Sequence, residues 1–184
     1  EKKDILVKSR TGSGKTASFA IPVIQDLVWD ERSPQALVLS PTRELALQIK
    51  GEFDNIGAYK RIKTAAVFGK QPFRFQAQDL KQRTHVVAGT PGRVLDHLEQ
   101  GTLRTDKLRY IILDEADEML NMGFIETVQK IFFHLPKTAS VCMFSATLPN
   151  EIQELANDFL KHPEAVEIKQ NTSVSEQMHH YAYR

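Results

Sequence analysis

The sequence has very little cysteine, no long apolar run and almost no net charge, and each of these absences excludes a class of protein. Cys142 is the one cysteine among 184 residues, so no disulfide framework can form within the chain, and its apolar neighbours predict a buried thiol. The apolar runs fall short of a membrane span and the start does not resemble a signal peptide, so we expect a cytoplasmic protein that contacts no membrane. With a net charge of +1, a site for a polyanion has to be a local cluster.

Short apolar runs, many of them rich in β-branched residues, recur along the chain with helical patterns between them. Most of the runs are nearly continuous rather than alternating, which is typical of strands buried on both faces of a parallel sheet. The predicted strands are Ile5–Val7, Ala36–Leu39, Thr64–Phe68, His85–Ala88, Tyr110–Leu113, Ser140–Phe144 and Ala165–Ile168. The predicted helices are Gly14–Val28, Arg43–Ala58, Phe73–Gln82, Gly92–Gln100, Gly123–His134 and Asn150–Leu160.

This alternation of strands and helices predicts an α/β fold, a three-layer sandwich with a mostly parallel sheet. We expect one domain over residues 1–169, which is long enough for a substantial core. Residues 170–184 are polar with little periodicity, so we interpret them as a linker toward a second domain. Trp29 is expected to pack at the end of the first helix, and Phe132 and Phe133 are expected to belong to the core.

The stretch "SRTGSGKT" lies between the first predicted strand and the first predicted helix. Glycines let backbone N–H groups surround an anion, and the helix start adds the positive end of its dipole. Lys15 is expected to reach the β- and γ-phosphates of a nucleotide, and the Thr16 hydroxyl to bind Mg²⁺. The alternative is a flexible turn that happens to carry a lysine, and the strand–loop–helix context favours the phosphate site. The expected phosphate-binding residues are Ser9, Arg10, Thr11, Gly12, Ser13, Gly14, Lys15 and Thr16.

A second acidic stretch, "YIILDEADEML", supplies the other half of such a site. Tyr110–Leu113 is a predicted strand, so Asp114 and Glu115 fall at its carboxyl end, the edge where ligands bind to open parallel sheets. Asp114 is expected to hold Mg²⁺, and Glu115 to orient or deprotonate the water that attacks the γ-phosphate. The alternative is that these acids only cap a helix. We expect Lys15, Asp114 and Glu115 to be the catalytic residues.

Several stretches together resemble the first RecA-like domain of DEAD-box RNA helicases. They follow one another in the family's order: "SRTGSGKT", "PTRELA" at Pro41–Ala46, "TPGR" at Thr90–Arg93, "DEAD" at Asp114–Asp117 and "SAT" at Ser145–Thr147. The resemblance implies a P-loop NTPase fold, ATP and Mg²⁺ as cofactors, and RNA as a partner. The stretches "AVFGK" and "DEADEMLNMGFIE" are similar to the bacterial DbpA-type branch, which acts on ribosomal RNA.

Three departures from the family pattern matter. Ser9 stands where the family usually has alanine, and it is small enough for the loop. Gly69–Lys70 stands where many members have two glycines, which puts the nucleic-acid contact there in question. The family's upstream segment, with a glutamine that reads adenine, and its second RecA-like domain, with arginine fingers, are not in this chain. The isolated chain is therefore expected to be nearly inactive.

The RNA-binding surface is expected beside the nucleotide. The two stretches that contain Arg43 and Arg93 each follow a predicted strand and precede a predicted helix, so these arginines and nearby N–H groups can bind successive phosphates. For either arginine alone, a surface ion pair is the alternative. The resemblance implies these RNA-binding residues: Pro41, Thr42, Arg43, Gly69, Lys70, Thr90, Pro91, Gly92 and Arg93. It also implies that Ser145, Ala146 and Thr147 bind Asp117 and couple the nucleotide state to strand separation.

The sequence therefore favours the first domain of an ATP-dependent RNA helicase, monomeric, working with a second RecA-like domain of the same protein. One alternative is another P-loop ATPase, such as a DNA translocase. A second alternative is a nucleotide-dependent clamp that holds RNA without catalysis. Glu115 argues against the clamp, because a clamp has no need of an acid that positions water.

Overall fold

The computed structural model of the chain describes residues 3–9 and 14–168. Its centre is a seven-stranded sheet in the order β3-β4-β2-β5-β6-β1-β7, and every neighbouring pair is parallel. The strands are β1 Ile5–Lys8, β2 Ala36–Leu39, β3 Thr64–Val67, β4 Val86–Gly89, β5 Tyr110–Leu113, β6 Ser140–Ser145 and β7 Glu164–Glu167. The predicted parallel α/β sheet is confirmed, and each strand begins and ends within two residues of its predicted bounds.

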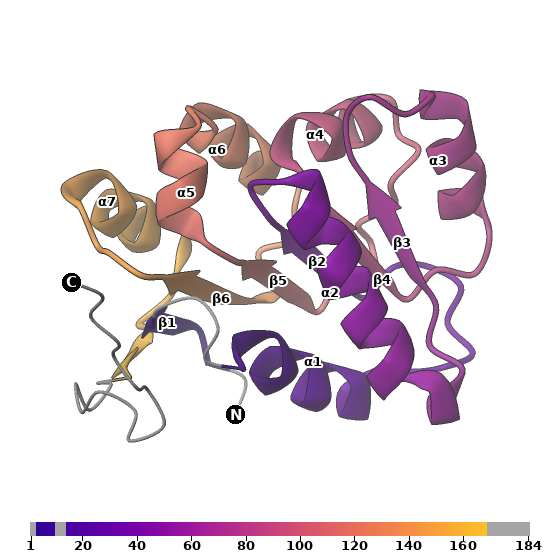
Figure 1. The fold of residues 1–184 in the computed structure, drawn as a ribbon, viewed down its shortest axis with the longest axis horizontal. Helices are drawn as coiled ribbons and strands as arrows, with labels where there is room; N and C mark the ends of the chain where they lie inside the picture. The colour runs from indigo at the N-terminus through magenta and orange to yellow at the C-terminus, as the bar shows by residue number, and fades with distance from the viewer. Residues whose placement is uncertain (1–2, 10–13, 169–184) are drawn as a thin grey trace, which may run out of the picture.

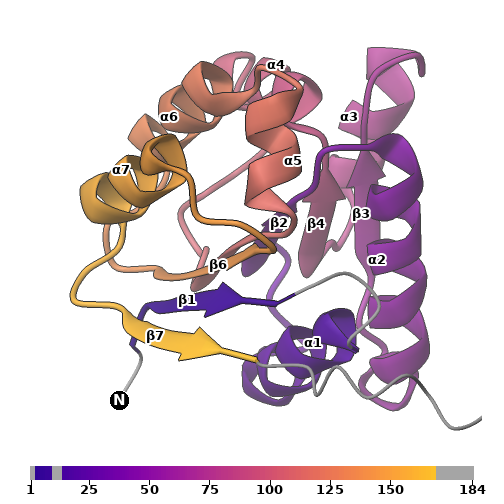
Figure 2. The same ribbon diagram turned by 60° about the vertical axis from the view of Figure 1, so that its left-hand side comes forward.

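Helices cover both faces of this sheet (Figures 1 and 2). They are α1 Lys15–Asp26, α2 Arg43–Ile56, the 3₁₀ helix η1 Ala58–Lys60, α3 Phe73–Lys81, α4 Pro91–Glu99, α5 Ala116–Asn121, α6 Ile125–Phe133 and α7 Asn150–Phe159. From β1 to β3 the chain moves across the sheet in one direction, and from β3 to β7 it moves back. Because parallel crossovers are right-handed, this reversal sends α1 and α2 to one face and α4 to α7 to the other.

The central strands are buried on both faces because their side chains alternate between two apolar clusters. Leu37 and Leu39 face the cluster formed with α4, α6 and α7, whereas Ala36 and Val38 face the cluster formed with α1 and α2. In β6, burial raises the pKa of the Cys142 thiol to about 11. Each sheet face thus contributes its own core, as a three-layer sandwich requires.

Some expectations from the sequence are wrong. β7 is exposed at all four positions rather than buried, because it lies at the sheet edge with β1 as its partner. Helix α5 was not predicted, since its six residues are too few to show a helical period. Helix α1 ends at Asp26, so Trp29 lies beyond it and is 54% exposed, and Phe133 is 81% exposed whereas Phe132 is buried. No helix among residues 3–9 and 14–168 is long and apolar enough to cross a membrane.

The parallel sheet brings the loops that follow β1 to β6 to one edge, at the carboxyl ends of the strands. The strand order divides this edge in two. The carboxyl ends of β5, β6 and β1 lie together, and we call this part, where the sequence predicts nucleotide binding, the nucleotide half. The carboxyl ends of β2, β4 and β3 lie together, and we call this part, where the sequence predicts RNA contacts, the RNA half. Every site residue predicted from the sequence lies in one half or the other, or in residues 10–13, outside the described part.

Candidate functional site

Lys15 and Asp114 meet in the nucleotide half although they are far apart in the sequence. Lys15 begins α1 after β1, and Asp114 directly follows β5, with β6 between these two strands. The Lys15 Nζ lies 3.5 Å from the Asp114 Oδ1, and both side chains are buried. A buried cation beside a buried carboxylate suits a site for phosphate and a divalent cation, because both charges are strengthened away from water.

Gly14 shows why the phosphate loop ends in glycine. It is the N-cap of α1 with φ +75°, in the left-handed region that side chains with a Cβ disfavour, although a Cβ here would meet no neighbouring atom. The requirement is therefore conformational rather than steric. Four predicted phosphate-binding residues, Arg10, Thr11, Gly12 and Ser13, lie outside the described residues. Thr16 follows in the first turn of α1, which places its hydroxyl on the same helix start as Lys15.

Ser9, one of the departures from the family pattern, directly follows β1. It is 3% exposed, and its backbone N–H donates to the Ser145 carbonyl at 2.9 Å, which continues the pairing of β1 with β6. Its buried hydroxyl oxygen has no hydrogen-bond partner among the described residues. The extra oxygen therefore carries a desolvation cost of about 1–3 kcal/mol that alanine would avoid.

The two acids after β5 have pKa values raised by their surroundings. Burial raises the pKa of Asp114, and the Lys15 charge only partly offsets this effect. Burial also raises the pKa of Glu115, and the Asp114 charge adds to it. Glu115 has φ 56°, an unfavourable conformation for a residue with a side chain, and it is the N-cap of α5. Strain and a raised pKa are typical of a residue held for proton transfer.

The residues after β6 are bonded to the acidic stretch after β5. Thr147 donates to one Asp117 carboxylate oxygen from its backbone N–H and from its hydroxyl, each at 2.9 Å. Ser145 accepts from the Asp117 backbone N–H at 3.2 Å and donates to the Thr147 carbonyl at 2.6 Å. Burial would raise the pKa of Asp117, but the bonds from Thr147 outweigh it and lower that pKa. These bonds join the loop after β5 to the loop after β6.

The arrangement of these groups fits a magnesium ion held together with nucleotide phosphates. The Asp114 Oδ1 is buried and makes no hydrogen bond in the described part of the chain apart from its ion pair with Lys15, so it keeps a lone pair for a metal ligand. Residues 3–9 and 14–168 contain no group of three His, Cys, Asp or Glu side chains that could hold a metal. Mg²⁺ usually takes one or two carboxylates and completes its shell with water and substrate phosphates, so one acid and a hydroxyl from Thr16 suffice.

The RNA half begins with the start of α2. Thr42 caps this helix by accepting from the Leu45 N–H at 3.2 Å, and Pro41 before it is buried. Arg43 is exposed, and its guanidinium lies 4.9 Å from the centroid of the Phe68 ring. Its charge is thus positioned by stacking while its N–H groups remain available in water for a phosphate.

The start of α4 lies beside it, because β4 is the neighbour of β2. Gly89 at the end of β4 allows β4 to pack closely against β3, since a Cβ there would lie 2.5 Å from a Val67 methyl group and 2.6 Å from the Val67 carbonyl oxygen. Pro91 is the first residue of α4, and Gly92 is exposed. Neither Thr90 nor another side chain caps this helix, so its first N–H groups point to the carboxyl edge.

Arg93 differs from Arg43, because it is bonded within the protein. Its side chain is 14% exposed, and its Nη1 donates to the Gln71 carbonyl at 2.9 Å and to the Gln76 Oε1 at 3.1 Å. Its Nε also lies 3.5 Å from an Asp96 carboxylate oxygen. The ion pair given as the alternative for Arg93 is therefore present. Together with the two hydrogen bonds, it holds the β3–α3 loop against α4.

Lys70 lies in that loop with φ 62°, the left-handed conformation that a glycine would adopt without strain. Gly69 and Lys70 are both exposed. The departure from two glycines thus keeps the turn and adds a charge at the cost of some backbone strain.

Comparison with known proteins identifies the family. A model of the DEAD/DEAH box helicase family matches residues 1–155. The chain belongs to this family. It is 58% identical over 169 residues to the ATP-dependent RNA helicase DbpA of Bacillus subtilis (strain 168), which covers 92% of this chain and 35% of that protein. It is 44% identical over 169 residues to the DEAD-box ATP-dependent RNA helicase CshA of Geobacillus kaustophilus, with 92% of this chain and 36% of that protein covered.

Solved structures agree with this assignment. A DEAD box protein from the hyperthermophile Methanococcus jannaschii superposes with a TM-score of 0.88 and 43% identity, over 91% of this chain and 46% of that one. An ATP-dependent RNA helicase described as hypothetical, from Sulfolobus tokodaii, gives a TM-score of 0.82 and 35% identity over 91% of this chain and 48% of that one. The chain thus spans about a third of the curated helicases and about half of the solved ones. The resemblance inferred from the motifs is confirmed, as is the RecA-like fold.

Sequence reasoning missed the residues that brace the RNA half of this helicase domain. Gln76 is buried on α3, and its amide donates to the Phe68 carbonyl at 2.9 Å while its oxygen contacts Arg93 and His97. His97 is buried on α4, and burial together with the Arg93 charge lowers its pKa to about 4, so it packs as a neutral ring. An isolated Gln or His inside a helical pattern gives no signal in one sequence.

Proposed function

We propose that this chain is the first RecA-like domain of an ATP-dependent RNA helicase, and that it binds ATP with Mg²⁺ in the nucleotide half and the RNA backbone in the RNA half. The observation that carries the proposal is the convergence of Lys15, Asp114 and Glu115 at one point of the carboxyl edge, with Lys15 Nζ 3.5 Å from Asp114 Oδ1. The DEAD/DEAH box family match supports nucleotide use by such a group.

Each residue has a separate part in hydrolysis. Lys15 compensates the charge on the β- and γ-phosphates, and Thr16 and Asp114 hold the metal, which when bound neutralises charge on the same oxygens. Glu115 accepts a proton from the attacking water or orients it, and its raised pKa brings it closer to the range in which a base works. The bonds between Thr147 and Asp117 carry the state of the nucleotide to the rest of the domain.

RNA binding in this proposal is independent of sequence, because the RNA half offers helix starts and cations and few groups that read base edges. Residues 1–169 form the domain, residues 170–184 lead to a second RecA-like domain, and an arginine finger from that domain completes the γ-phosphate site. The protein works as a cytoplasmic monomer. We infer that the nucleic acid is RNA rather than DNA because the relatives named above are RNA helicases. We infer ribosomal RNA from the resemblance to the DbpA-type branch.

The test compares ATP hydrolysis by the 184-residue chain and by the full-length protein, each with and without single-stranded RNA or DNA. Since a finger from across the cleft contributes on the order of 10³ to 10⁵ in rate in related P-loop enzymes, the chain alone should be nearly inactive. RNA should stimulate the full-length protein, and DNA should not. Equal rates for the two proteins would show a self-sufficient ATPase instead. Stimulation by DNA would favour a translocase, and RNA binding without turnover would favour a clamp.

A further inference from the structure

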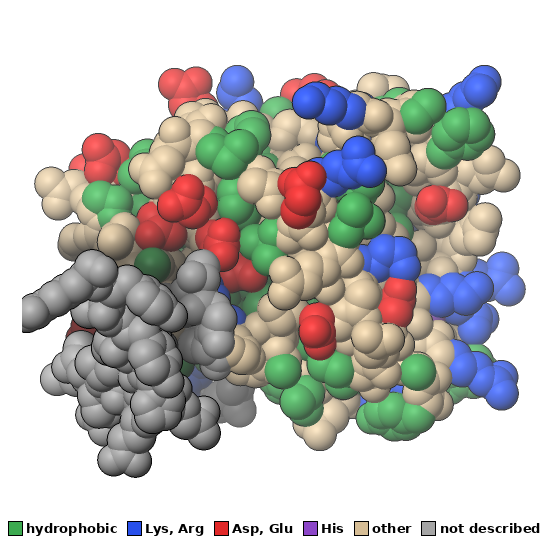
Figure 3. Space-filling view, viewed as in Figure 1, with side chains coloured by type: hydrophobic (Ala, Val, Ile, Leu, Met, Phe, Trp, Pro, Cys, Tyr) green, Lys and Arg blue, Asp and Glu red, His purple; other side chains and the backbone are tan. Residues whose placement is uncertain are grey.

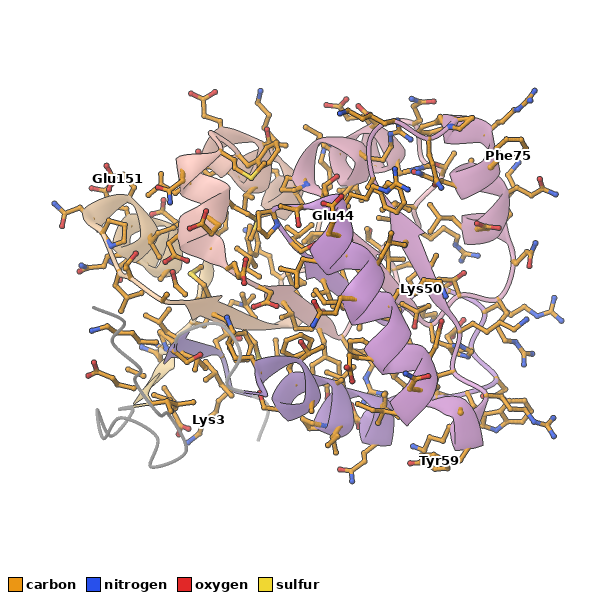
Figure 4. The ribbon with its side chains drawn as sticks, viewed as in Figure 1. Lys3, Glu44, Lys50, Tyr59, Phe75 and Glu151 are labelled. Atoms are coloured by element: carbon orange, nitrogen blue, oxygen red, sulfur yellow. The ribbon has the colours of Figure 1, made fainter. Side chains whose placement is uncertain are left out.

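The free edge of β3 forms the base of an open groove of about 360 Å³. Leu47 and Lys50 of α2 lie on one side of it, and Gln82 and Arg83, just after α3, lie on the other. Figure 4 shows Lys50 on the side of α2 toward β3. Because β3 is an edge strand, no further strand covers this surface in the described part of the chain.

One end of this groove opens into the RNA half. Phe68 lines the groove and stacks against Arg43 at 4.9 Å. Gln71 also lines it, and its carbonyl accepts from Arg93 at 2.9 Å. A strand bound along Arg43 and the start of α4 therefore reaches the groove directly. The groove then follows the four residues of β3, about 13 Å at 3.3 Å per residue, toward the opposite edge of the sheet.

The other end of the groove meets two exposed aromatic rings. Arg83 lines the groove, and its guanidinium lies 5.4 Å from the centroid of the Trp29 ring. Trp29 and Tyr59 line a second hollow of about 540 Å³ and are 54% and 73% exposed. In Figure 4 Tyr59 lies at the far end of α2 from Glu44, with Lys50 between them. Arg83 thus joins the two hollows.

Buried polar side chains fix the segment that carries Trp29. The Nε2 of His85 donates to the Trp29 carbonyl at 2.8 Å, and its Nδ1 accepts from the Lys63 N–H at 3.0 Å. Gln35 makes two bonds with the backbone of Val28, at 2.8 and 2.9 Å. With its backbone held by these bonds and its ring in contact with Arg83, the exposed indole is a preformed platform, and a ligand would bind it at little cost in ordering.

The charges around this path favour a polyanion. Arg61, Lys63 and Arg83 form no ion pair with any residue in the described ranges. Asp79 and Asp30 are the acids that line the two hollows, and Lys50 is paired with Asp54. Figure 3 shows Lys and Arg side chains gathered on the side of α3 and β3, and Asp and Glu gathered on the side of α5 and α7. Exposed aromatic rings among cations without an ion pair, one of which stacks on Trp29, are the usual platform for single-stranded nucleic acid.

We propose that single-stranded RNA leaving the RNA half continues along the free edge of β3 and stacks a base on Trp29. Lys63, Arg83 and Arg61 contact its phosphates, and Tyr59 offers a second stacking surface. The proposal rests on the proposed function only for the RNA half as the point where the strand enters. It assigns RNA contacts to residues that lie outside all the family motifs.

The test uses the full-length protein and two fluorescent oligouridylates, one of about 6 nucleotides that fills the RNA half and one of about 20 nucleotides that also reaches the groove. Affinities are measured by fluorescence anisotropy for the wild type and for Trp29→Ala combined with Arg83→Glu. The matched control is Phe133→Ala combined with Lys130→Glu, which removes an exposed ring and a cation on α6. Thermal unfolding checks that both variants are folded.

The variant loses a stacked base and a phosphate contact together, so it should bind the long RNA about tenfold or more weakly and the short RNA within about twofold of wild type. Its salt slope for the long RNA should fall by about 0.7 for the lost phosphate contact. The control should change neither. Equal affinities of wild type and variant for the long RNA would overturn the proposal. The free edge of β3 would then fit an added peptide strand better than RNA. Failure of the wild type to bind the short RNA would instead contradict the RNA half itself.

Discussion

The charged side chains in the two halves of the carboxyl edge differ in their exposure to water and in their bonding. In the nucleotide half, Lys15, Asp114 and Asp117 are each at most 8% exposed and are tied to partners. In the RNA half, Arg43 and Lys70 are exposed, and only Arg93 is bonded inward. Charges withdrawn from water act strongly on one small, fixed group, whereas charges in water hold a long flexible polyanion and are weakened by salt. This difference is the one that the proposed function needs, with chemistry in the nucleotide half and binding of a polyanion in the RNA half.

The largest expected effect comes from Glu115, the acid that should act only in the reaction. In the full-length protein, Glu115→Gln should keep ATP binding and lower turnover by on the order of 10² to 10⁴, the usual contribution of a general base. Glu118→Gln, three residues away on the exposed side of α5, is the matched control and should be nearly neutral. Phosphate-release rates and calorimetric titration measure both. Normal turnover in Glu115→Gln would remove the catalytic assignment.

The pH dependence of turnover should report the same residue. Because burial and the Asp114 charge raise the pKa of Glu115, its carboxylate is protonated at a higher pH than an exposed glutamate. Turnover of the full-length protein should therefore fall on acidification with a midpoint above the ordinary glutamate value. In Glu115→Gln, the residual rate should lack this midpoint. A midpoint that stays in the mutant would assign the titration to another group.

Thr147→Ala removes the hydroxyl bond to the Asp117 carboxylate and so tests whether the buried charges of the nucleotide half contribute to stability. The folded-state pKa of Asp117 is lowered, so its contribution to stability is present above the unfolded value and is lost as the pH falls through the folded value. The variant should lose about 1–2 kcal/mol of unfolding free energy near pH 7, and less in acid. Thr147→Ser keeps the hydroxyl and should be close to wild type. Denaturant titrations at neutral and acidic pH decide whether the loss depends on pH.

The two arginines of the RNA half should differ in stability. Arg93→Ala removes hydrogen bonds to Gln71 and Gln76 and should cost about 1–2 kcal/mol of unfolding free energy. Arg43→Ala removes an exposed side chain and should change stability by less than about 0.5 kcal/mol. Both should weaken RNA of any sequence, and Arg43→Ala should lower the salt slope by about 0.7. Equal stability losses would show that the inward bonding of Arg93 is immaterial.

The smallest effect is expected at Lys70. Since its φ is 62°, Lys70→Gly should relieve backbone strain and raise the unfolding free energy by up to about 1 kcal/mol. Lys70→Ala removes the same charge and keeps the strain, so it is the control. Both variants should lose the same RNA affinity, which separates the charge from the turn.

Much of the fold was predictable because its signals are local. Continuous apolar runs such as Ala36–Leu39 identify strands buried on two faces, and the loops that follow them then have to share one edge. The positions of Lys15 and Asp114 at that edge follow from the same argument. The contact between Lys15 and Asp114 depends on the strand order, in which only β6 separates β1 from β5. That order could not be predicted from the sequence.

Features set by tertiary contacts could not be predicted. The exposure of Phe133 beside the burial of Phe132 depends on where α7 packs, and the inward bonds of Arg93 depend on Gln76, which lies on another helix. The backbone at Trp29 is held by His85, the residue just before β4, whose ring bonds to the Trp29 carbonyl. In each case the deciding partner is distant in the sequence and has no motif.

The most direct test of the divided edge uses the full-length protein with Lys15→Ala or with Arg43→Glu. For each variant, two affinities are measured, for ATP without RNA and for single-stranded RNA without nucleotide. We expect a crossed pattern. Lys15→Ala should abolish detectable ATP binding and leave RNA affinity within about twofold, whereas Arg43→Glu should weaken RNA by about tenfold or more and leave ATP affinity unchanged. If either substitution lowered both affinities to a similar extent, the two halves would not be separate sites and the account would be wrong.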